Sequence, residues 1–395
     1  MSFSGLTAYL DSLAEKYGVP GFDILITKDH ETVYRHMGGY SDYGRRVPVN
    51  GNELYYIYSA TKVITMTAAV QLILRGTIGL DDPVSRYLPE FEHMEVADRC
   101  ELGKWPPDVP TLRDPHHPAR TPITLRMLMT MTAGLNYEIG GEPILAAKKE
   151  TGNQADTRRM MKAVAEMPLL FEPGTRYSYS LGHDVIAAVI EVVTGRSFSA
   201  YLKENIFDPL EIRDMYFHPG PEQLSRLAAQ YSCQPETGKI VPGPSGNAYC
   251  LSGRYESGGA GLCCSAEAYS AVAEALANGG TGRNGARILS PEGVALMSEN
   301  QLSETVLPDF LVPWRTEYGY GLGVRTLIRP EGSPTPPGEF GWDGAAGAYA
   351  LMDPVNRVSI FYAQEILGMM KVYQEIHPAI RNLAYGALRD AGLLS

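Results

Sequence analysis

Residues that favour β-strands gather at both ends of this chain. Residues 22–27 and 32–37 are rich in β-branched, leucine and aromatic side chains and flank the polar turn 28–30, which predicts a hairpin. Residues 347–352 and 357–364 flank a second turn, 353–356, and predict another hairpin. Residues 318–326, with glycines at alternate positions, predict one further strand.

Apolar residues recur at helical spacing through the rest of the chain. Leu6, Tyr9, Leu10 and Leu13 predict a first helix, and residues 59–76 predict a second that ends near Gly76. The same spacing predicts helices over 125–131, 156–166, 183–194, 198–205, 266–278 and 371–390.

Strands at both ends and a helical middle define the expected fold class, α/β plus all-α. We expect one antiparallel sheet built from both chain termini and flanked by helices, with a large helical domain inserted. The sheet domain would comprise residues 1–80 and 315–395, the inserted domain residues 81–314, and the active site would lie between them. Residues 92–122, rich in proline, histidine and charge, predict a loop over the surface.

Composition narrows the classes of function. Of the 395 residues, 44% are apolar and 20% are charged, so the chain can bury a full core. The 45 acidic and 34 basic residues give a net charge of −11, which argues against a nucleic-acid partner. No stretch has the roughly 18 unbroken apolar residues of a membrane helix. The N-terminus lacks the pattern of a secretory signal and the five cysteines form no CxxC pair, so we expect a cytoplasmic protein with reduced thiols and no metal or cofactor.

Ser59 and Lys62 are the first candidate catalytic residues. Residues at i and i+3 of a helix share one face, with Cβ atoms about 5–6 Å apart. A serine hydroxyl needs a base to become a nucleophile, and a lysine amine can be that base if burial holds its pKa down. A bare SxxK pattern is also compatible with an ordinary serine cap and an exposed lysine.

Longer motifs accompany this pair. In chain order they read SATKVITMTAAVQLILRGTIGLDDPVSRYLPEF, TPITLRMLMTMTAGL, FEPGTRYSYSLGHD and GWDGAAGAYALMDP. Together they resemble the penicillin-binding-protein and class C β-lactamase superfamily, and within it the family VIII esterases and related acyltransferases. The resemblance runs over most of the chain and implies the β-lactamase/transpeptidase-like fold.

The resemblance also implies roles for individual residues. Ser59 would be the acylated nucleophile, Lys62 its proton acceptor and Tyr179 the second-motif tyrosine, whose pKa neighbouring ammonium groups could lower. The backbone N–H groups of Ser59 and Ala345 would form the oxyanion hole. The third motif and substrate pocket would comprise Trp342, Asp343 and Gly344, with Tyr177 and Tyr58 nearby; Tyr177 is the rival of Tyr179.

Two departures from the family pattern bear on the substrate. No asparagine follows Tyr179, because the sequence continues Ser180-Leu181. Trp342 stands where β-lactamases and D,D-peptidases have a cationic Lys or His that holds the carboxylate of the substrate. An indole offers apolar area instead, and W-x-G resembles the esterase branch. Asp343 either adds negative charge to the pocket or turns away to bind a backbone group.

The leading hypothesis is therefore a serine hydrolase that cleaves small carboxylic esters through an acyl-enzyme on Ser59, with possible acyl transfer to an alcohol or amine. A β-lactamase, D,D-peptidase or D-aminopeptidase is the alternative enzyme, and a non-catalytic ligand-binding relative is the alternative of another class. His183-Asp184 does not form a triad with Ser59, because adjacent helical residues face different directions. The oligomeric state is open.

Overall fold

The computed structural model describes residues 3–100, 102 and 109–394. Within these residues an eight-stranded antiparallel sheet forms in the order β11-β12-β13-β14-β15-β1-β2-β3. Strands from the two ends of the chain meet where β1 pairs with β15, as the sequence predicts. The strands are β1 (Gly21–Lys28), β2 (Glu31–Asp42), β3 (Val47–Pro48), β11 (Tyr318–Tyr320), β12 (Arg325–Leu327), β13 (Phe340–Asp343), β14 (Tyr349–Asp353) and β15 (Val358–Ala363).

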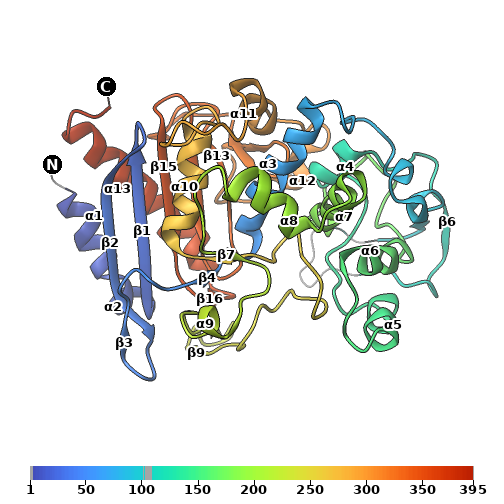
Figure 1. Cartoon of the computed structure of the whole chain (residues 1–395), viewed down its shortest axis with the longest axis horizontal. Coiled ribbons are helices and arrows are strands. Elements are labelled where there is room, and N and C mark those ends of the chain that lie inside the picture. The colour runs from blue at the N-terminus through green and yellow to red at the C-terminus, as the bar shows by residue number, and fades with distance from the viewer. Residues whose placement is uncertain (1–2, 101, 103–108, 395) are drawn as a thin grey trace.

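Helices cover both faces of this sheet (Figure 1). α1 (Ser4–Asp11), α2 (Leu13–Tyr17) and α13 (His377–Asp390) lie on one face, and α10 (Ala266–Ala277) lies on the other. The alternation of side chains along β1 explains this arrangement, because Ile24 and Ile26 join the core cluster under α1 and α13, whereas Leu25 joins the cluster on the α10 side. Because both faces are covered, the six consecutive residues Phe22–Thr27 of β1 are all buried.

The middle of the chain forms most of the remaining helices, which lie beside the sheet (Figure 1). Thr124, Asp156, Ser197, Ser265 and Ser290 each cap a helix by accepting a hydrogen bond from the backbone of its first turn. The helices are α3 (Thr61–Leu74), α4 (Leu125–Met129), α5 (Glu142–Glu150), α6 (Thr157–Ala165), α7 (Gly182–Thr194), α8 (Phe198–Leu202), α9 (Pro221–Leu224), α11 (Pro291–Ser298) and α12 (Leu307–Phe310).

Short sheets connect these layers. β4 (Tyr55–Tyr56), β10 (Cys263–Cys264) and β7 (Met215–Tyr216) form one; β16 (Ile366–Leu367), β8 (Tyr231–Cys233) and β9 (Ile240–Pro242) form a second; and β5 (Glu95–Ala97) pairs with β6 (His116–Pro118). Short 3-10 helices run over Tyr58–Ala60, Val84–Arg86 and Pro89–Phe91, and π-helical turns over Lys203–Phe207 and Val372–Ile376.

The single strand expected over residues 318–326 differs from the structure. Residues 318–326 form two strands, β11 and β12, joined by a tight turn, because Gly323 adopts a φ of +73° and Gly321 donates to the carbonyl of Val324 at 2.8 Å. The boundary of the inserted domain at 81–314 stays a prediction, but α10, which lies inside that range, packs on the sheet against β1, β14 and β15.

Residues 92–122 are more than a surface loop. Within this stretch β5 pairs with β6, and Cys100, Leu102 and Val109 line the main cavity described below. Residues 101 and 103–108 of the predicted loop lie outside the described residues. The prolines and charges of this segment gave no sign of its contact with the cavity.

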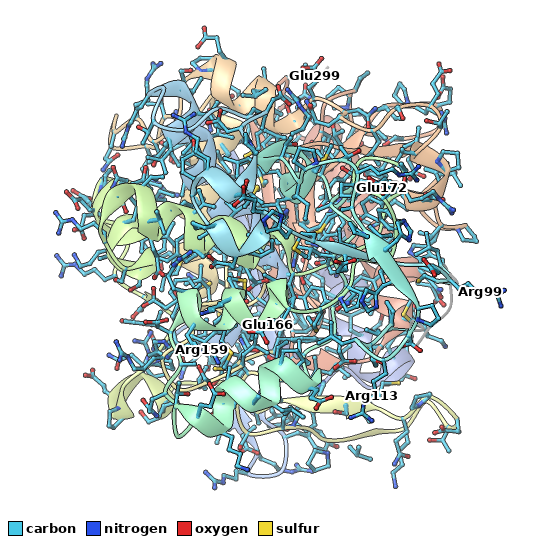
Figure 2. The ribbon with its side chains drawn as sticks, turned by 90° about the vertical axis from the view of Figure 1, so that its right-hand side faces the viewer. Arg99, Arg113, Arg159, Glu166, Glu172 and Glu299 are labelled. Carbon is cyan, nitrogen blue, oxygen red and sulfur yellow. The ribbon has the colours of Figure 1, made fainter. Side chains whose placement is uncertain are left out.

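The outer end of the helical region carries both signs of charge. Figure 2 looks at this end and labels Arg99, Arg113, Arg159, Glu166, Glu172 and Glu299. These labelled residues form no patch of one sign.

No single described helix is long and apolar enough to cross a membrane. α7 and the segment Phe198–Phe207 pass such a test only as a pair, bent by 77°. The residues of α7 from Gly182 to Ile190 are all buried in the core.

Candidate active site

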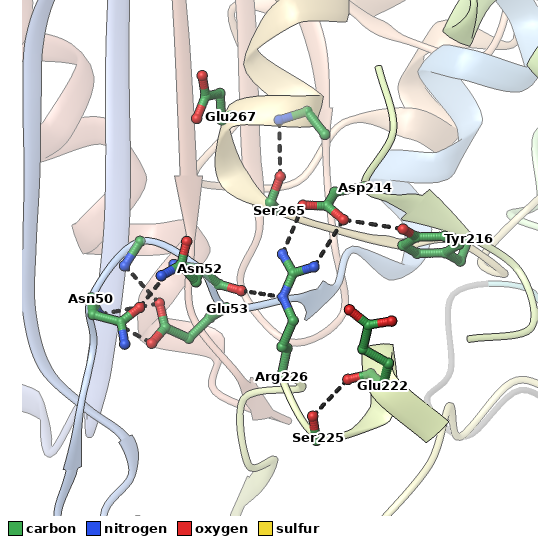
Figure 3. Close-up of polar contacts among 12 residues, drawn as sticks. Asn50, Asn52, Glu53, Asp214, Tyr216, Glu222, Ser225, Arg226, Ser265 and Glu267 are labelled. Atoms are coloured by element: carbon green, nitrogen blue, oxygen red, sulfur yellow. Dashed lines mark hydrogen bonds and ion pairs between the residues drawn. The ribbon is translucent and has the colours of Figure 1, made fainter. Parts of the chain in front are cut away.

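The backbone that leads to Ser59 is anchored by a polar cluster and a small sheet. The Arg226 guanidinium donates to both carboxylate oxygens of Asp214, at 2.9 and 2.7 Å, and to the carbonyl of Asn52 at 2.8 Å (Figure 3). β4 then pairs with β10, three residues before Ser59. These contacts fix the strand from which the nucleophile helix begins.

Ser59 lies in a 3-10 turn that continues directly into α3. Tyr58, the residue before it, is fully buried and has a φ of +43°, a left-handed conformation that costs about 1–3 kcal/mol for a non-glycine residue. The Tyr58 hydroxyl donates to Gln230, which holds the ring in place. Tyr58 does not line the main cavity, so the structure places this predicted pocket residue beneath the site as a support for the turn.

Lys62 lies one helical turn after Ser59, inside the core. Its side chain is fully buried, and Nζ donates to the carbonyl of Gly259 at 2.7 Å and to Oγ of Ser59 at 3.3 Å. Burial lowers the pKa of Lys62 to about 7, against a smaller opposing effect of the Asp184 carboxylate. A neutral amine is therefore available beside the serine hydroxyl near neutral pH.

Tyr179 is the tyrosine that joins this pair. Nζ of Lys62 lies 4.6 Å from the centre of its ring, and Nε1 of Trp342 donates to its hydroxyl at 3.2 Å. The side chain of Ser59 is near enough to that hydroxyl to favour a lower pKa. Burial raises the pKa of Tyr179, contrary to the expectation that a lysine could lower it. Tyr179 is thus a neutral phenol. Tyr177, its rival, packs against other aromatic rings of the cavity wall.

Behind Lys62 lies a network that the sequence did not indicate. The buried carboxylate of Asp184 accepts hydrogen bonds from Tyr255 at 2.5 Å, from Ser257 at 2.6 Å and from the N–H of Gly259 at 3.2 Å. A Cβ at Gly259 would lie 2.6 Å from Asp184 and 3.3 Å from Nζ of Lys62, so only glycine fits there. Asp184 therefore acts on Lys62 through its field and through the position of the Gly259 carbonyl.

β13 forms the opposite wall of the site. Trp342 stacks on the ring of Tyr179 with centroids 5.8 Å apart. At Gly344 a Cβ would lie 2.3 Å from the carbonyl oxygen of Ile57, so the strand runs directly against the turn that carries Ser59. Ala345 lines the same cavity as Ser59, and its part in an oxyanion hole stays a prediction.

Asp343 lies in the cavity wall, and its charge is paired with a buried cation. Its Oδ1 accepts from Nη1 of Arg325 at 2.8 Å, so the negative charge that the sequence placed in the pocket is balanced there. Arg325 also donates to the carbonyl of Ala350 at 3.0 Å. The physical reason is topological, because residue 325 on β12 and residue 341 on β13 are paired, which brings Arg325 near Asp343 on the same face.

The cavity around these residues has a volume of about 650 Å³. Aromatic side chains dominate the wall near Ser59: Tyr137, Tyr177, Tyr179, Tyr249, Phe310 and Trp342. A volume of this order holds a ligand of drug size, and a mostly apolar wall with a few polar groups is typical of sites for small molecules.

Comparison with known proteins gives the family of this chain. A family model described as "Beta-lactamase" matches residues 6–384. The chain belongs to the β-lactamase family. It is 32% identical to lovastatin esterase from Penicillium rubens over 294 residues, which cover 71% of each chain. It is 28% identical to acyltransferase calJ from Penicillium decumbens over 365 residues, 87% of this chain and 83% of that protein.

A solved structure shows the same fold. The structure titled "EstCE1, a hydrolase with promiscuous acyltransferase activity" superposes with a TM-score of 0.76 at 24% identity, covering 97% of this chain and 98% of that one. The β-lactamase/transpeptidase-like architecture expected from the sequence is confirmed by this superposition.

Proposed function

We propose that this chain is a serine hydrolase that cleaves small carboxylic esters through an acyl-enzyme and can pass the acyl group to an alcohol or amine. The proposal rests on one contact: Nζ of the fully buried Lys62 lies 3.3 Å from Oγ of Ser59. Burial lowers the pKa of this lysine to about 7. Relatives that carry the names esterase and acyltransferase support both outcomes of the acyl-enzyme.

In the proposed acylation, Oγ of Ser59 attacks the ester carbonyl carbon and forms a C–O bond, while the hydroxyl proton passes to Nζ of Lys62. The carbonyl oxygen becomes an oxyanion, which the N–H groups of Ser59 and Ala345 would stabilise. Collapse breaks the bond to the leaving alkoxide, which takes the proton of the Tyr179 hydroxyl. Tyr179 regains a proton from the ammonium of Lys62.

Deacylation runs the same transfers in reverse. A water molecule, or a second alcohol or amine, gives its proton to the base as it attacks the acyl-enzyme, and Ser59 leaves with a proton from the relay. The ratio of hydrolysis to acyl transfer depends on how well the cavity binds an alcohol or amine relative to water. The aromatic wall around Trp342 favours an organic acceptor with apolar surface.

Trp342 also supports an ester over a penicillin or peptide substrate. The indole stacks on Tyr179 and donates to its hydroxyl, at the position where the resemblance implies a cation for a carboxylate. We therefore propose that β-lactam and D,D-peptide hydrolysis are minor at most. From the five cysteines, which form no CxxC pair, we further propose a cytoplasmic location.

The test uses the purified full chain and its S59A variant. We expect a fluorophosphonate probe to label the chain and S59A to remain unlabelled. We expect p-nitrophenyl butanoate to be hydrolysed much faster than nitrocefin, and an added alcohol to yield the new ester. Equal labelling of S59A, or nitrocefin turnover that exceeds ester turnover, would refute the proposal.

A further inference from the structure

The cavity continues from Ser59 to a second, polar compartment on the other face of the sheet. Trp342 and Asp343 are adjacent on β13 and therefore point to opposite faces, yet both line the same cavity. Beyond Asp343 the wall changes from aromatic to polar. It comprises Arg325, Tyr349, Tyr373, His377 and Arg381, from β12, β14, the π-helical turn before α13 and α13 itself.

His377 leaves an unused acceptor in this compartment. Its ring is 97% buried, and Nε2 lies 3.1 Å from the carbonyl of Gly347. Since a carbonyl only accepts, Nε2 carries the proton and Nδ1 presents a lone pair. Among the described residues, Nδ1 has no hydrogen-bond partner. Stacking on Tyr349, with centroids 4.5 Å apart, and an edge contact with Tyr373 hold the ring in this orientation.

Asp343 supplies a second acceptor beside the first. Its Oδ1 lies 3.7 Å from Nδ1 of His377, and its side chain keeps 16% of its surface exposed in the cavity wall. Burial lowers the pKa of His377 to about 4, so the imidazole is neutral and gives no proton to this carboxylate. Oδ1 of Asp343 already accepts from Arg325, but a carboxylate oxygen can accept a second hydrogen bond, whereas Nδ1 of His377 has no partner. The unpartnered Nδ1 calls for an O–H or N–H group from a ligand, and Asp343 offers a further acceptor beside it.

The charges in this compartment select among donors. Arg325 is paired with Asp343 at 2.8 Å, and Arg381 lies 3.7 Å from Glu317. An ammonium ligand would meet two buried guanidinium groups, which repel it. A carboxylate ligand would offer an acceptor where His377 and Asp343 already present acceptors. A neutral hydroxyl group can donate to these acceptors and is not repelled by the charges around it.

In the proposed reaction we assign the compartment to the leaving-group side. Tyr179, which would protonate the departing alcohol, is hydrogen-bonded to Trp342, the neighbour of Asp343 on the strand. Asp343 is the last residue of β13, and Ala345 lies in the turn that follows it. Two residues of chain span at most about 7 Å, a distance that a linear alcohol part of about four to six carbons can bridge.

We propose that this compartment recognises a free hydroxyl group on the alcohol part of the ester, with His377 and Asp343 as the acceptors. This inference rests on the function proposed above and names its substrate class: esters of diols and other hydroxylated alcohols. His377 is then a residue that determines specificity, in a part of the cavity remote from Ser59.

The test compares butanoate esters that differ by a hydroxyl or a methyl group at the end of the alcohol, for example 4-hydroxybutyl and pentyl butanoate, over chains of three to six carbons. We expect the purified chain to prefer the hydroxylated ester by about three- to tenfold in kcat/KM at one chain length, the effect of one hydrogen bond. H377L should bring this ratio to about one, and H377Q, whose amide oxygen can accept, should restore part of it. H116L, which changes an exposed histidine of β6, should keep the original ratio.

Three results would overturn the proposal: no preference at any chain length, an unchanged preference in H377L, or a stronger preference for the matched carboxylate-ended ester. If H377L does not fold, inhibition of the wild-type chain decides the matter. Diols must then inhibit the hydrolysis of p-nitrophenyl butanoate more strongly than alkanols of equal length, and equal inhibition refutes the subsite. Loss of p-nitrophenyl butanoate turnover in S59A tests the proposed function separately, so the two can fail independently.

Discussion

Replacing Lys62 by methionine should abolish activity and at the same time stabilise the fold near neutral pH. Lys62 is fully buried, and burial lowers its pKa from the ordinary 10.5 to about 7. A shift of this size corresponds to about 5 kcal/mol of unfavourable free energy in the native state. Methionine has similar length and no charge, so it removes this cost.

The loss of a hydrogen bond in K62M opposes this stabilisation but is smaller. Methionine leaves the carbonyl of Gly259 without the donor that lies 2.7 Å away, which costs about 1–3 kcal/mol. The net gain at pH 7 should therefore be about 2–4 kcal/mol. A buried lysine retained against stability is typical of a functional site.

The pH dependence makes the prediction specific. Below pH 10.5 the unfolded chain holds a proton on Lys62, and above pH 7 the folded chain does not, so the wild-type free energy of unfolding gains a rising contribution between these values. The advantage of K62M should shrink by about 3 kcal/mol between pH 7 and pH 9.5.

Denaturant unfolding of K62M and of the wild type at both pH values measures this difference. Lys149→Met, at an exposed position of α5, is the matched control and should show no such trend. If the difference between K62M and the wild type is the same at pH 7 and pH 9.5, Lys62 is not held neutral against its ordinary pKa, and the mechanism loses its base.

Three further predictions concern Lys62 and its neighbours in the candidate active site. The kcat/KM for esters should rise with pH through a midpoint near 7, because the base is the neutral amine of Lys62; in D184N a pH-rate profile should show this midpoint at lower pH, because the carboxylate raises the pKa of Lys62. Y179F should lower kcat for p-nitrophenyl butanoate at least about 10²-fold with an unchanged melting temperature, and near-wild-type turnover would exclude Tyr179 from the relay. G344A should lower both activity and melting temperature, because its Cβ would lie 2.3 Å from the carbonyl oxygen of Ile57; normal values in a thermal melt and an ester assay would contradict that packing.

Much of the fold followed from local pattern. The hairpins around residues 28–30 and 353–356 and the helices α7 and α10 were predicted correctly, because their apolar residues recur with a strong periodicity. Ser265 also caps α10. The prediction of a single strand over residues 318–326 was wrong. Alternate glycines are compatible both with a strand and with the turn that Gly323 makes. Motifs in the sequence predicted the candidate catalytic residues Ser59, Lys62 and Tyr179. Each motif is short, so the residue types and their spacing can be recognised from the sequence.

Only the tertiary structure shows the contacts between residues that are distant in the sequence. The sequence by itself determined a serine one turn before a lysine, and a tryptophan where a cation is common in the family. It could not show that the lysine amine is buried and neutral, that Asp184 lies behind it, or that Asp343 pairs with Arg325. A pKa depends on how much water and which charges surround a group. The packing of α7 and of the segment at Gly259 around α3 brings the neighbours of Lys62 from more than a hundred residues away, and the pairing of β12 with β13 brings Arg325 to Asp343.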